Sequence, residues 1–118
     1  MGRTVLIVDD HPSFRASARA VLEAEGFEIV GEANDGASAL TAARDLKPDV
    51  VLLDVQLPDT DGFEICRECL AKNGCNPRIV LVSSRDAADY GELISRSGAT
   101  GFIAKAELSG EALAALVE

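Results

Sequence analysis

Five short apolar stretches recur along the chain, and each is followed by a segment with helical periodicity. Three of them, VLIV, VVLL and IVLV, are continuously apolar, which is typical of parallel strands covered on both faces of a sheet. Another, FEIVG, mixes polar and apolar residues and suits an edge strand. The pattern predicts strands over residues 5–8, 27–31, 50–53, 79–82 and 101–104.

The segments between these strands predict five helices. Pro12 suits the first position of a helix, where a backbone N–H is not needed, and Gly26 suits a helix end. Gly91 lies inside the fourth helical segment and is expected to weaken it. The helices are predicted from Pro12 to just before Gly26, over about 35–46, 61–72 and 86–96, and from near Ser109 onward.

This alternation predicts one α/β domain over residues 1–118. Strands and helices at this spacing form a (βα)5 doubly wound sheet, with five parallel strands and helices on both faces. Ligands of such sheets bind beyond the carboxyl ends of the strands. Candidate functional residues are therefore those that directly follow each strand.

The net charge of the chain indicates which classes of binding partner are unfavourable. The chain has 20 acidic and 11 basic residues, a net charge of −9, which argues against this domain itself binding nucleic acid or an anionic membrane surface. Its apolar runs are far shorter than the roughly 18 residues of a membrane span. The amino-terminal stretch MGRTVLIVDD does not resemble a secretory signal, so we expect a cytoplasmic protein.

Three cysteines give an odd count that fits no closed disulfide framework. Cys66 and Cys69 have the Cys-x-x-Cys spacing of half a zinc site or a redox pair. In a helix, however, both fall on the same side as Phe63 and Leu70, and cysteine is among the most buried residue types. The spacing therefore favours core packing; Cys75 lies beyond this helix.

Polar side chains follow four of the five predicted strands. Any one of them alone could cap a helix or bind a backbone group. Together they place three carboxylates at one edge, and two unit charges about 4 Å apart repel by about 4 kcal/mol at an effective dielectric near 20. A hard cation such as Mg²⁺, which takes carboxylate, water and phosphate oxygens, would offset that repulsion. The residues are Asp9 and Asp10 after the first strand, Asp54 after the third, Ser83 and Ser84 after the fourth, and Lys105 after the fifth.

With VLIVDDHPSF, VLLDVQLPDTDG, LVSS and GFIAK in this order, the chain resembles a response-regulator receiver domain of two-component signalling over its whole length. His11-Pro12 and the stretch Lys105-Ala-Glu-Leu-Ser are most similar to the branch usually fused to a LuxR-type helix-turn-helix output domain. The resemblance implies a flavodoxin-like fold with strand order 2-1-3-4-5. It also implies a role in transcription regulation.

The resemblance further implies a phosphoacceptor and a metal site. Asp54 would be the nucleophile that forms an aspartyl-phosphate. Asp10, Asp54 and the backbone carbonyl of Gln56 would ligate Mg²⁺ directly, and Asp9 would act through water. The phosphodonor would be a phosphohistidine on a sensor histidine kinase. Such a domain assists its own phosphorylation and dephosphorylation without being an enzyme for other substrates.

The remaining roles implied by the resemblance concern the switch. Lys105 would pair with Asp54 and then with the phosphoryl group, and Ser83 would donate its hydroxyl to a phosphoryl oxygen. Phe102 lies where receivers carry an aromatic switch residue, but as phenylalanine it has no hydroxyl to anchor a change of rotamer. The face of the fourth helix, fifth strand and fifth helix would then change, with a possible homodimer on phosphorylation.

Two alternatives remain open from the sequence. A haloacid-dehalogenase-like phosphohydrolase also uses an aspartyl nucleophile and Mg²⁺, but it requires D-x-D after the strand, and Gln56 stands at the second acidic position. A degenerate receiver would act only as an interaction module. Labelling by a small phosphodonor with Mg²⁺ separates this last case from a phosphoacceptor.

Overall fold

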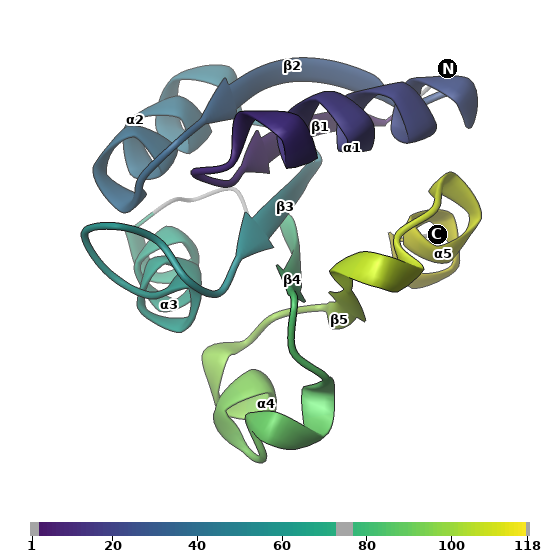
Figure 1. Cartoon of the computed structure of the whole chain (residues 1–118). Coiled ribbons are helices and arrows are strands. Elements are labelled where there is room, and N and C mark those ends of the chain that lie inside the picture. Colours follow the sequence, from purple (N-terminus) through teal and green to yellow (C-terminus); the bar gives the residue numbers. More distant parts are fainter. Residues whose placement is uncertain (1–2, 73–76, 118) are drawn as a thin grey trace.

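Five parallel strands form one sheet in the order β2-β1-β3-β4-β5 (Figure 1). The structure, a computed structural model, describes residues 3–72 and 77–117. The (βα)5 fold and its strand order agree with the expectation. The strands are β1 Thr4–Val8, β2 Glu28–Ala33, β3 Val50–Asp54, β4 Arg78–Ser83 and β5 Gly101–Ala104.

The continuously apolar stretches became the three central strands. β3 is buried along its whole length, including its final aspartate, because helices cover both sides of it. The edge strand β2 begins and ends later than predicted, running two residues further to Ala33. Its pairing with β1 extends to Val8↔Ala33, a register that the mixed local sequence does not reveal.

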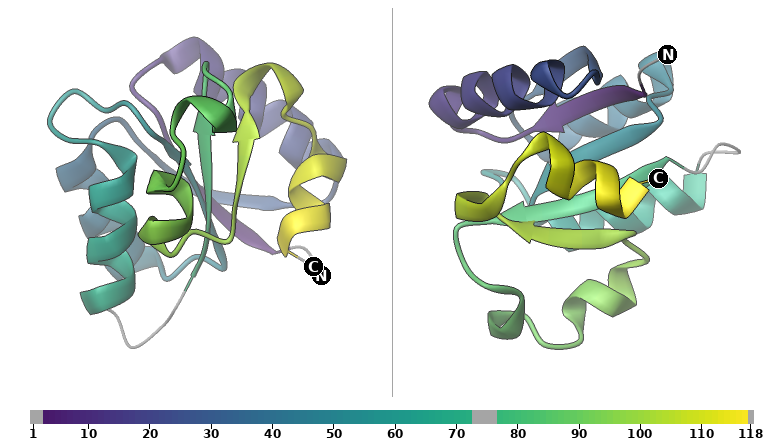
Figure 2. Two further views of the ribbon diagram at one scale, coloured as in Figure 1. Left: turned by 90° about the horizontal axis from the view of Figure 1, so that it is seen from below. Right: turned by 90° about the vertical axis from the view of Figure 1, so that its right-hand side faces the viewer.

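Helices cover the two faces of the sheet. Figures 1 and 2 show α1 and α5 on one face and α2, α3 and α4 on the other. Asp35 caps α2 by accepting the Ser38 N–H at 2.8 Å, and Ser109 caps α5 by accepting the Ala112 N–H at 3.0 Å. The helices are α1 Pro12–Ala24, α2 Gly36–Leu46, α3 Gly62–Lys72, α4 Leu93–Ser97 and α5 Gly110–Val117, with short 3₁₀ turns η1 Ala87–Asp89 and η2 Lys105–Glu107.

The predicted fourth helix, over about 86–96, is wrong as a continuous element. The chain instead forms the single turn η1 and then the short α4. Gly91 between them has φ +56°, in the left-handed region that interrupts a helix. Most side chains of this segment are exposed, so little packing opposes the break at Gly91.

Two apolar cores lie on opposite faces of the sheet, one under α2 and α3 and the other under α1 and α5. Cys66 and Cys69 are 0% and 2% exposed in the first of these cores, which agrees with core packing. The Cys66 thiol donates to the Ser97 carbonyl at 3.3 Å, and burial raises the pKa of this thiol to about 11. Cys75 lies outside the described residues.

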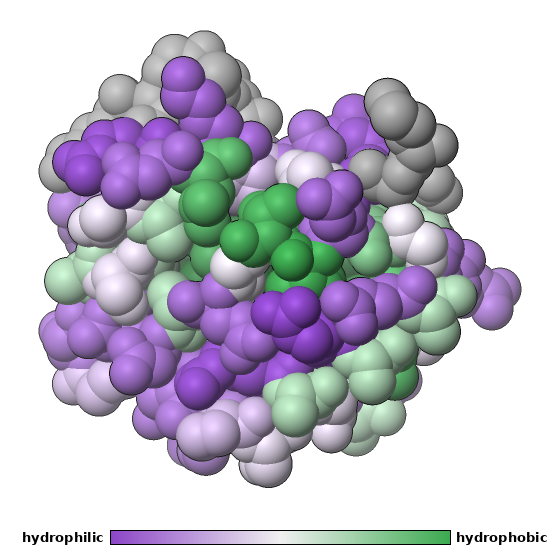
Figure 3. All heavy atoms as spheres, turned by 90° about the horizontal axis from the view of Figure 1, so that it is seen from above, coloured by the Kyte–Doolittle hydropathy of each residue, from purple (hydrophilic) through white to green (hydrophobic). Residues whose placement is uncertain are grey.

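The surface is mostly polar. The face seen from above in Figure 3, where Figure 1 shows α1, β2 and α2, carries a central apolar patch within a hydrophilic surround. Val21 of α1 and Leu46 of α2 are 40% and 44% exposed. Across the described ranges 3–72 and 77–117, no helix has the length and apolar character needed to cross a membrane.

Candidate functional site

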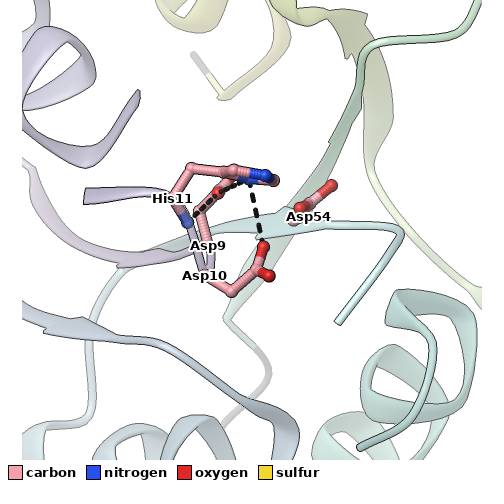
Figure 4. Close-up of side chains that lie close together, drawn as sticks. All are labelled: Asp9, Asp10, His11 and Asp54. Carbon is pink, nitrogen blue, oxygen red and sulfur yellow. Dashed lines mark hydrogen bonds and ion pairs between the residues drawn. The ribbon is translucent and has the colours of Figure 1, made fainter. Parts of the chain in front are cut away.

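The carboxyl edge of the sheet gathers the polar residues that follow β1, β3, β4 and β5. The parallel register pairs Asp54 with Val82 and Ser83 with Ala104, so these strand ends lie at one level of the sheet. Figure 4 shows the carboxylates of Asp9, Asp10 and Asp54 close together, from the β1–α1 loop and the end of β3. The arrangement therefore concentrates negative charge at one point.

Asp54 is the last residue of a rigid, fully buried strand and is only 3% exposed. Its Oδ1 accepts the Gln56 N–H at 3.3 Å, and its Oδ2 accepts from the Lys105 ammonium at 3.4 Å. Burial and the charge of Asp9 raise the pKa of Asp54 to about 6, although Lys105 acts in the opposite direction. Asp54 is thus an oriented carboxylate in an environment that resists its negative charge.

Asp9 lies deepest in the site, with no exposed surface. Its Oδ1 accepts the backbone N–H of His11 at 2.8 Å, so it does help to organise the start of α1. The His11 Nδ1 lies 3.0 Å from Asp9 Oδ1 and 3.1 Å from Asp10 Oδ1 (Figure 4). Sequence reasoning did not include His11 in the site, although its position directly after the acidic pair was a usable signal.

Lys105 lies nearer to Asp9 than to Asp54. Its Nζ is 2.6 Å from Asp9 Oδ2 and 3.4 Å from Asp54 Oδ2, so the pairing implied for Asp54 is shared and weighted towards Asp9. The ammonium also lies 4.5 Å from the centre of the Phe14 ring on α1, a cation–π distance. These contacts hold the ammonium between the two carboxylates.

The donor set fits a divalent cation. One ligand atom from each of Asp9, Asp10, His11 and Asp54 lies within 4.8 Å of the others. Within the described residues, the fully buried Asp9 Oδ2 has no hydrogen bond, because its short contact with Lys105 is an ion pair without hydrogen-bond geometry. Clustered carboxylates that include a buried oxygen without a hydrogen bond are chemically suited to a hard cation.

Backbone bonds fix the loop that follows Asp54. Val55 donates to the Val82 carbonyl at 2.9 Å, Gly62 donates to the Val55 carbonyl at 2.7 Å, and Gln56 pairs with Asp61 in an isolated bridge. A Cβ on Gly62 would overlap the Asp54 carbonyl oxygen, so this tight return needs glycine. The loop therefore holds the Gln56 backbone, which the resemblance assigns to the metal, directly beside Asp54.

The Ser83 hydroxyl is bound by two residues of the segment that follows β4. Its Oγ lies 2.5 Å from the Tyr90 hydroxyl and accepts the Arg85 N–H at 3.1 Å. Tyr90 contacts Phe63 edge-on at 5.4 Å between ring centres and Phe102 at 5.9 Å. Sequence reasoning missed Tyr90, because no local pattern indicates that its hydroxyl reaches back to the end of β4.

Comparisons with known proteins agree with this architecture. The family model of the response regulator receiver domain matches residues 5–118. The chain is 36% identical over 107 residues to the virulence-factor transcription regulator BvgA of Bordetella pertussis, covering 91% of this chain and 51% of that protein. It thus spans about half the length of the curated relatives that it matches.

Two solved structures are similar over nearly the whole chain. A LuxR-family two-component response regulator from Aurantimonas sp. matches with a TM-score of 0.86 and 29% identity, covering 98% of this chain and 86% of that one. The BeF3-activated receiver domain of RstA from Klebsiella pneumoniae matches with a TM-score of 0.83 and 31% identity, covering 96% and 94%. These findings do not favour the phosphohydrolase or the interaction-module alternative. The chain belongs to the family of response regulator receiver domains of two-component signalling.

Proposed function

We propose that Asp54 is the phosphoacceptor of this receiver domain and takes its phosphoryl group from a phosphohistidine on a sensor histidine kinase. The observation that carries the proposal is the position of this carboxylate. It is buried at the end of a central strand, and an ammonium and two further acids face it. A rigid strand end aims a nucleophile better than a loop does.

The transfer is a displacement at phosphorus. A carboxylate oxygen of Asp54 forms the new O–P bond while the P–N bond to the donor imidazole breaks, and the imidazole nitrogen leaves with the electron pair. Catalysis then consists mainly of positioning and of stabilising charge on the phosphoryl oxygens. In this proposal Lys105 supplies one stabilising charge and Ser83 supplies a hydroxyl donor. The domain assists its own phosphorylation and dephosphorylation and acts on no other substrate.

The acidic pocket would hold Mg²⁺. Asp10, Asp54 and the Gln56 carbonyl are the proposed direct ligands, and Asp9 is proposed to act through water. When bound, the ion would neutralise charge on the carboxylates and on the phosphoryl oxygens. Lys105 keeps Asp9 and Asp54 compatible with each other, and its distances of 2.6 Å and 3.4 Å support that role.

The proposed output is a change of surface on the α4–β5–α5 side. Phe102 is the proposed aromatic switch residue, and its contact with Tyr90 links it to Ser83. Homodimerisation on phosphorylation is one proposed readout. Because named relatives such as BvgA are transcription regulators about twice this length, we propose that the receiver controls a DNA-binding output domain rather than binding DNA itself.

Phosphotransfer labelling tests the proposal. Wild type should become labelled by a small phosphodonor in the presence of Mg²⁺, whereas Asp54→Ala should not, and chelation should abolish the label. Asp45→Ala is the matched control, because Asp45 is an exposed aspartate of α2 whose ion pair is with Arg44. Stable label on Asp54→Ala would refute the assignment. Absence of label on wild type would favour an interaction module, and turnover of a phosphomonoester would favour the phosphohydrolase.

A further inference from the structure

Tyr90 makes the shortest side-chain hydrogen bond of Ser83. The two hydroxyl oxygens are 2.5 Å apart, and the second bond of Ser83 comes from the Arg85 N–H at 3.1 Å. Among the described hydrogen bonds, Ser83 has none to Asp54, the proposed phosphoacceptor. The hydroxyl is therefore held towards the β4–α4 segment.

Tyr90 is also the anchor of that segment. From residue 84 to residue 93 every residue is exposed except Tyr90, which is half-buried. Its ring packs against both Phe63 of α3 and Phe102 of β5. Gly91 follows directly with φ +56°, so the helix breaks beside this anchor. A change at Tyr90 can thus alter the position of the whole stretch between β4 and α4.

The Ser83 hydroxyl cannot bind Tyr90 and a group on Asp54 at the same time. Turning the Ser83 hydroxyl towards a group on Asp54 moves Oγ between staggered positions, a displacement of about 2 Å. A hydrogen bond of 2.5 Å does not survive such a displacement unless its partner follows. The rings of Phe63 and Phe102 oppose that movement, since both are in contact with the Tyr90 ring.

We propose that Tyr90 is a positioning residue that holds the Ser83 hydroxyl in the unphosphorylated state and loses it to the phosphoryl group on Asp54. This inference rests on the proposed function and adds the residue through which the site restrains its own activation. Tyr90 contacts the rings of Phe63 and Phe102, neither of which has a hydroxyl. Of these three aromatic residues, only Tyr90 can therefore hydrogen-bond to Ser83.

Release of Tyr90 would reshape a defined surface. Tyr90 and Leu93 line a groove of about 540 Å³ together with Gln56 and Phe63. Leu93 is 47% exposed. Gln56 comes from the loop after Asp54, so the groove joins the acceptor loop to the segment that Tyr90 anchors. Movement of Tyr90 therefore changes a surface next to the reacting group.

The composition provides a direct probe. Tyr90 is the only tyrosine and the chain has no tryptophan, so its intrinsic fluorescence reports on this one side chain. Titration of wild type with beryllofluoride and Mg²⁺ should change the tyrosine emission in step with binding. Replacing Ser83 with alanine should shift the starting emission towards that of the bound state. Emission that stays constant while beryllofluoride binds would overturn the inference.

Tyr90→Phe tests the hydroxyl alone, because both ring contacts are kept. Removing one hydrogen bond that only the unactivated state makes should tighten beryllofluoride binding by about two- to tenfold, read from the ¹⁹F NMR signal of the bound species. In a Ser83→Ala background the same substitution should have no effect. Phe27→Leu, in the core on the opposite face of the sheet, is the control for loss of a ring away from Tyr90, and it should not tighten binding. Thermal melting checks that each variant is folded.

The outcomes separate the two proposals. If wild type neither takes label nor binds beryllofluoride, the proposed phosphoacceptor function fails. If wild type binds normally while Tyr90→Phe binds equally well or more weakly, the function stands and the role of Tyr90 is refuted. Tyr90→Phe could instead raise beryllofluoride affinity equally in the wild-type and the Ser83→Ala background. That result would also refute the role of Tyr90, because the effect would then not depend on the Ser83 hydroxyl.

Discussion

Replacing Asp54 with asparagine should stabilise the metal-free protein at neutral pH, although it removes the proposed phosphoacceptor. Burial, and secondarily the charge of Asp9, raise the pKa of Asp54 from its ordinary 3.8 to about 6. A carboxyl group with a raised pKa adds stability in its protonated form, in full below pH 3.8. That stability is lost as the pH rises through about 6. Asparagine imitates the protonated form at every pH.

The size of the effect follows from proton linkage. With pKa values of 3.8 unfolded and about 6 folded, Asp54→Asn should gain about 1.5 kcal/mol in free energy of unfolding at pH 5 and about 3 kcal/mol at pH 7.5. The asparagine oxygen can still accept the Gln56 N–H, and Lys105 keeps its nearer partner Asp9 at 2.6 Å. Little is therefore lost to offset the gain.

Urea unfolding in the presence of EDTA, at pH 5 and pH 7.5, measures this difference between the two proteins. Added Mg²⁺ should then stabilise wild type more than the variant, because wild type has the third carboxylate. The reasoning would be refuted if Asp54→Asn were less stable than wild type at pH 7.5. It would also be refuted if the gain in free energy of unfolding were as large at pH 5 as at pH 7.5. Either result would mean that Asp54 is well compensated without a metal.

Three further predictions concern the surroundings of the site. Phe102→Ala should leave labelling intact and weaken binding to the partner of the phosphorylated domain; unchanged binding in a pull-down would exclude a switch role. Gly62→Ala should lower the free energy of unfolding by about 1–3 kcal/mol, measured by urea melts, because its Cβ would overlap the Asp54 carbonyl. Burial raises the pKa of Cys66 to about 11 and also raises that of Cys69. Alkylation of Cys66 at pH 8, followed by peptide mapping, should therefore be about 100-fold slower than for a free thiol, alkylation of Cys69 should also be slowed, and rapid labelling of either would contradict their burial.

The fold could be predicted because the apolar runs, the helix caps and the proline positions all indicate the same alternation of strands and helices. Continuously apolar runs predict buried parallel strands, and the capping and proline signals predict where helices begin. The fourth helix was the exception. Its glycine has a left-handed conformation and its apolar face is thin, so local propensity did not determine its structure.

The sequence by itself determined which residues meet at the carboxyl edge, since strand ends in a parallel sheet share one edge whatever the details of packing. Asp9, Asp54, Ser83 and Lys105 could all be placed there in advance. Only the tertiary structure decided which partner each one takes: Lys105 lies closer to Asp9 than to Asp54, and Tyr90 takes the Ser83 hydroxyl. Such choices depend on ångström-scale distances between side chains from separate elements. Burial, competing charges and one left-handed turn set those distances, and no periodicity along the chain encodes them.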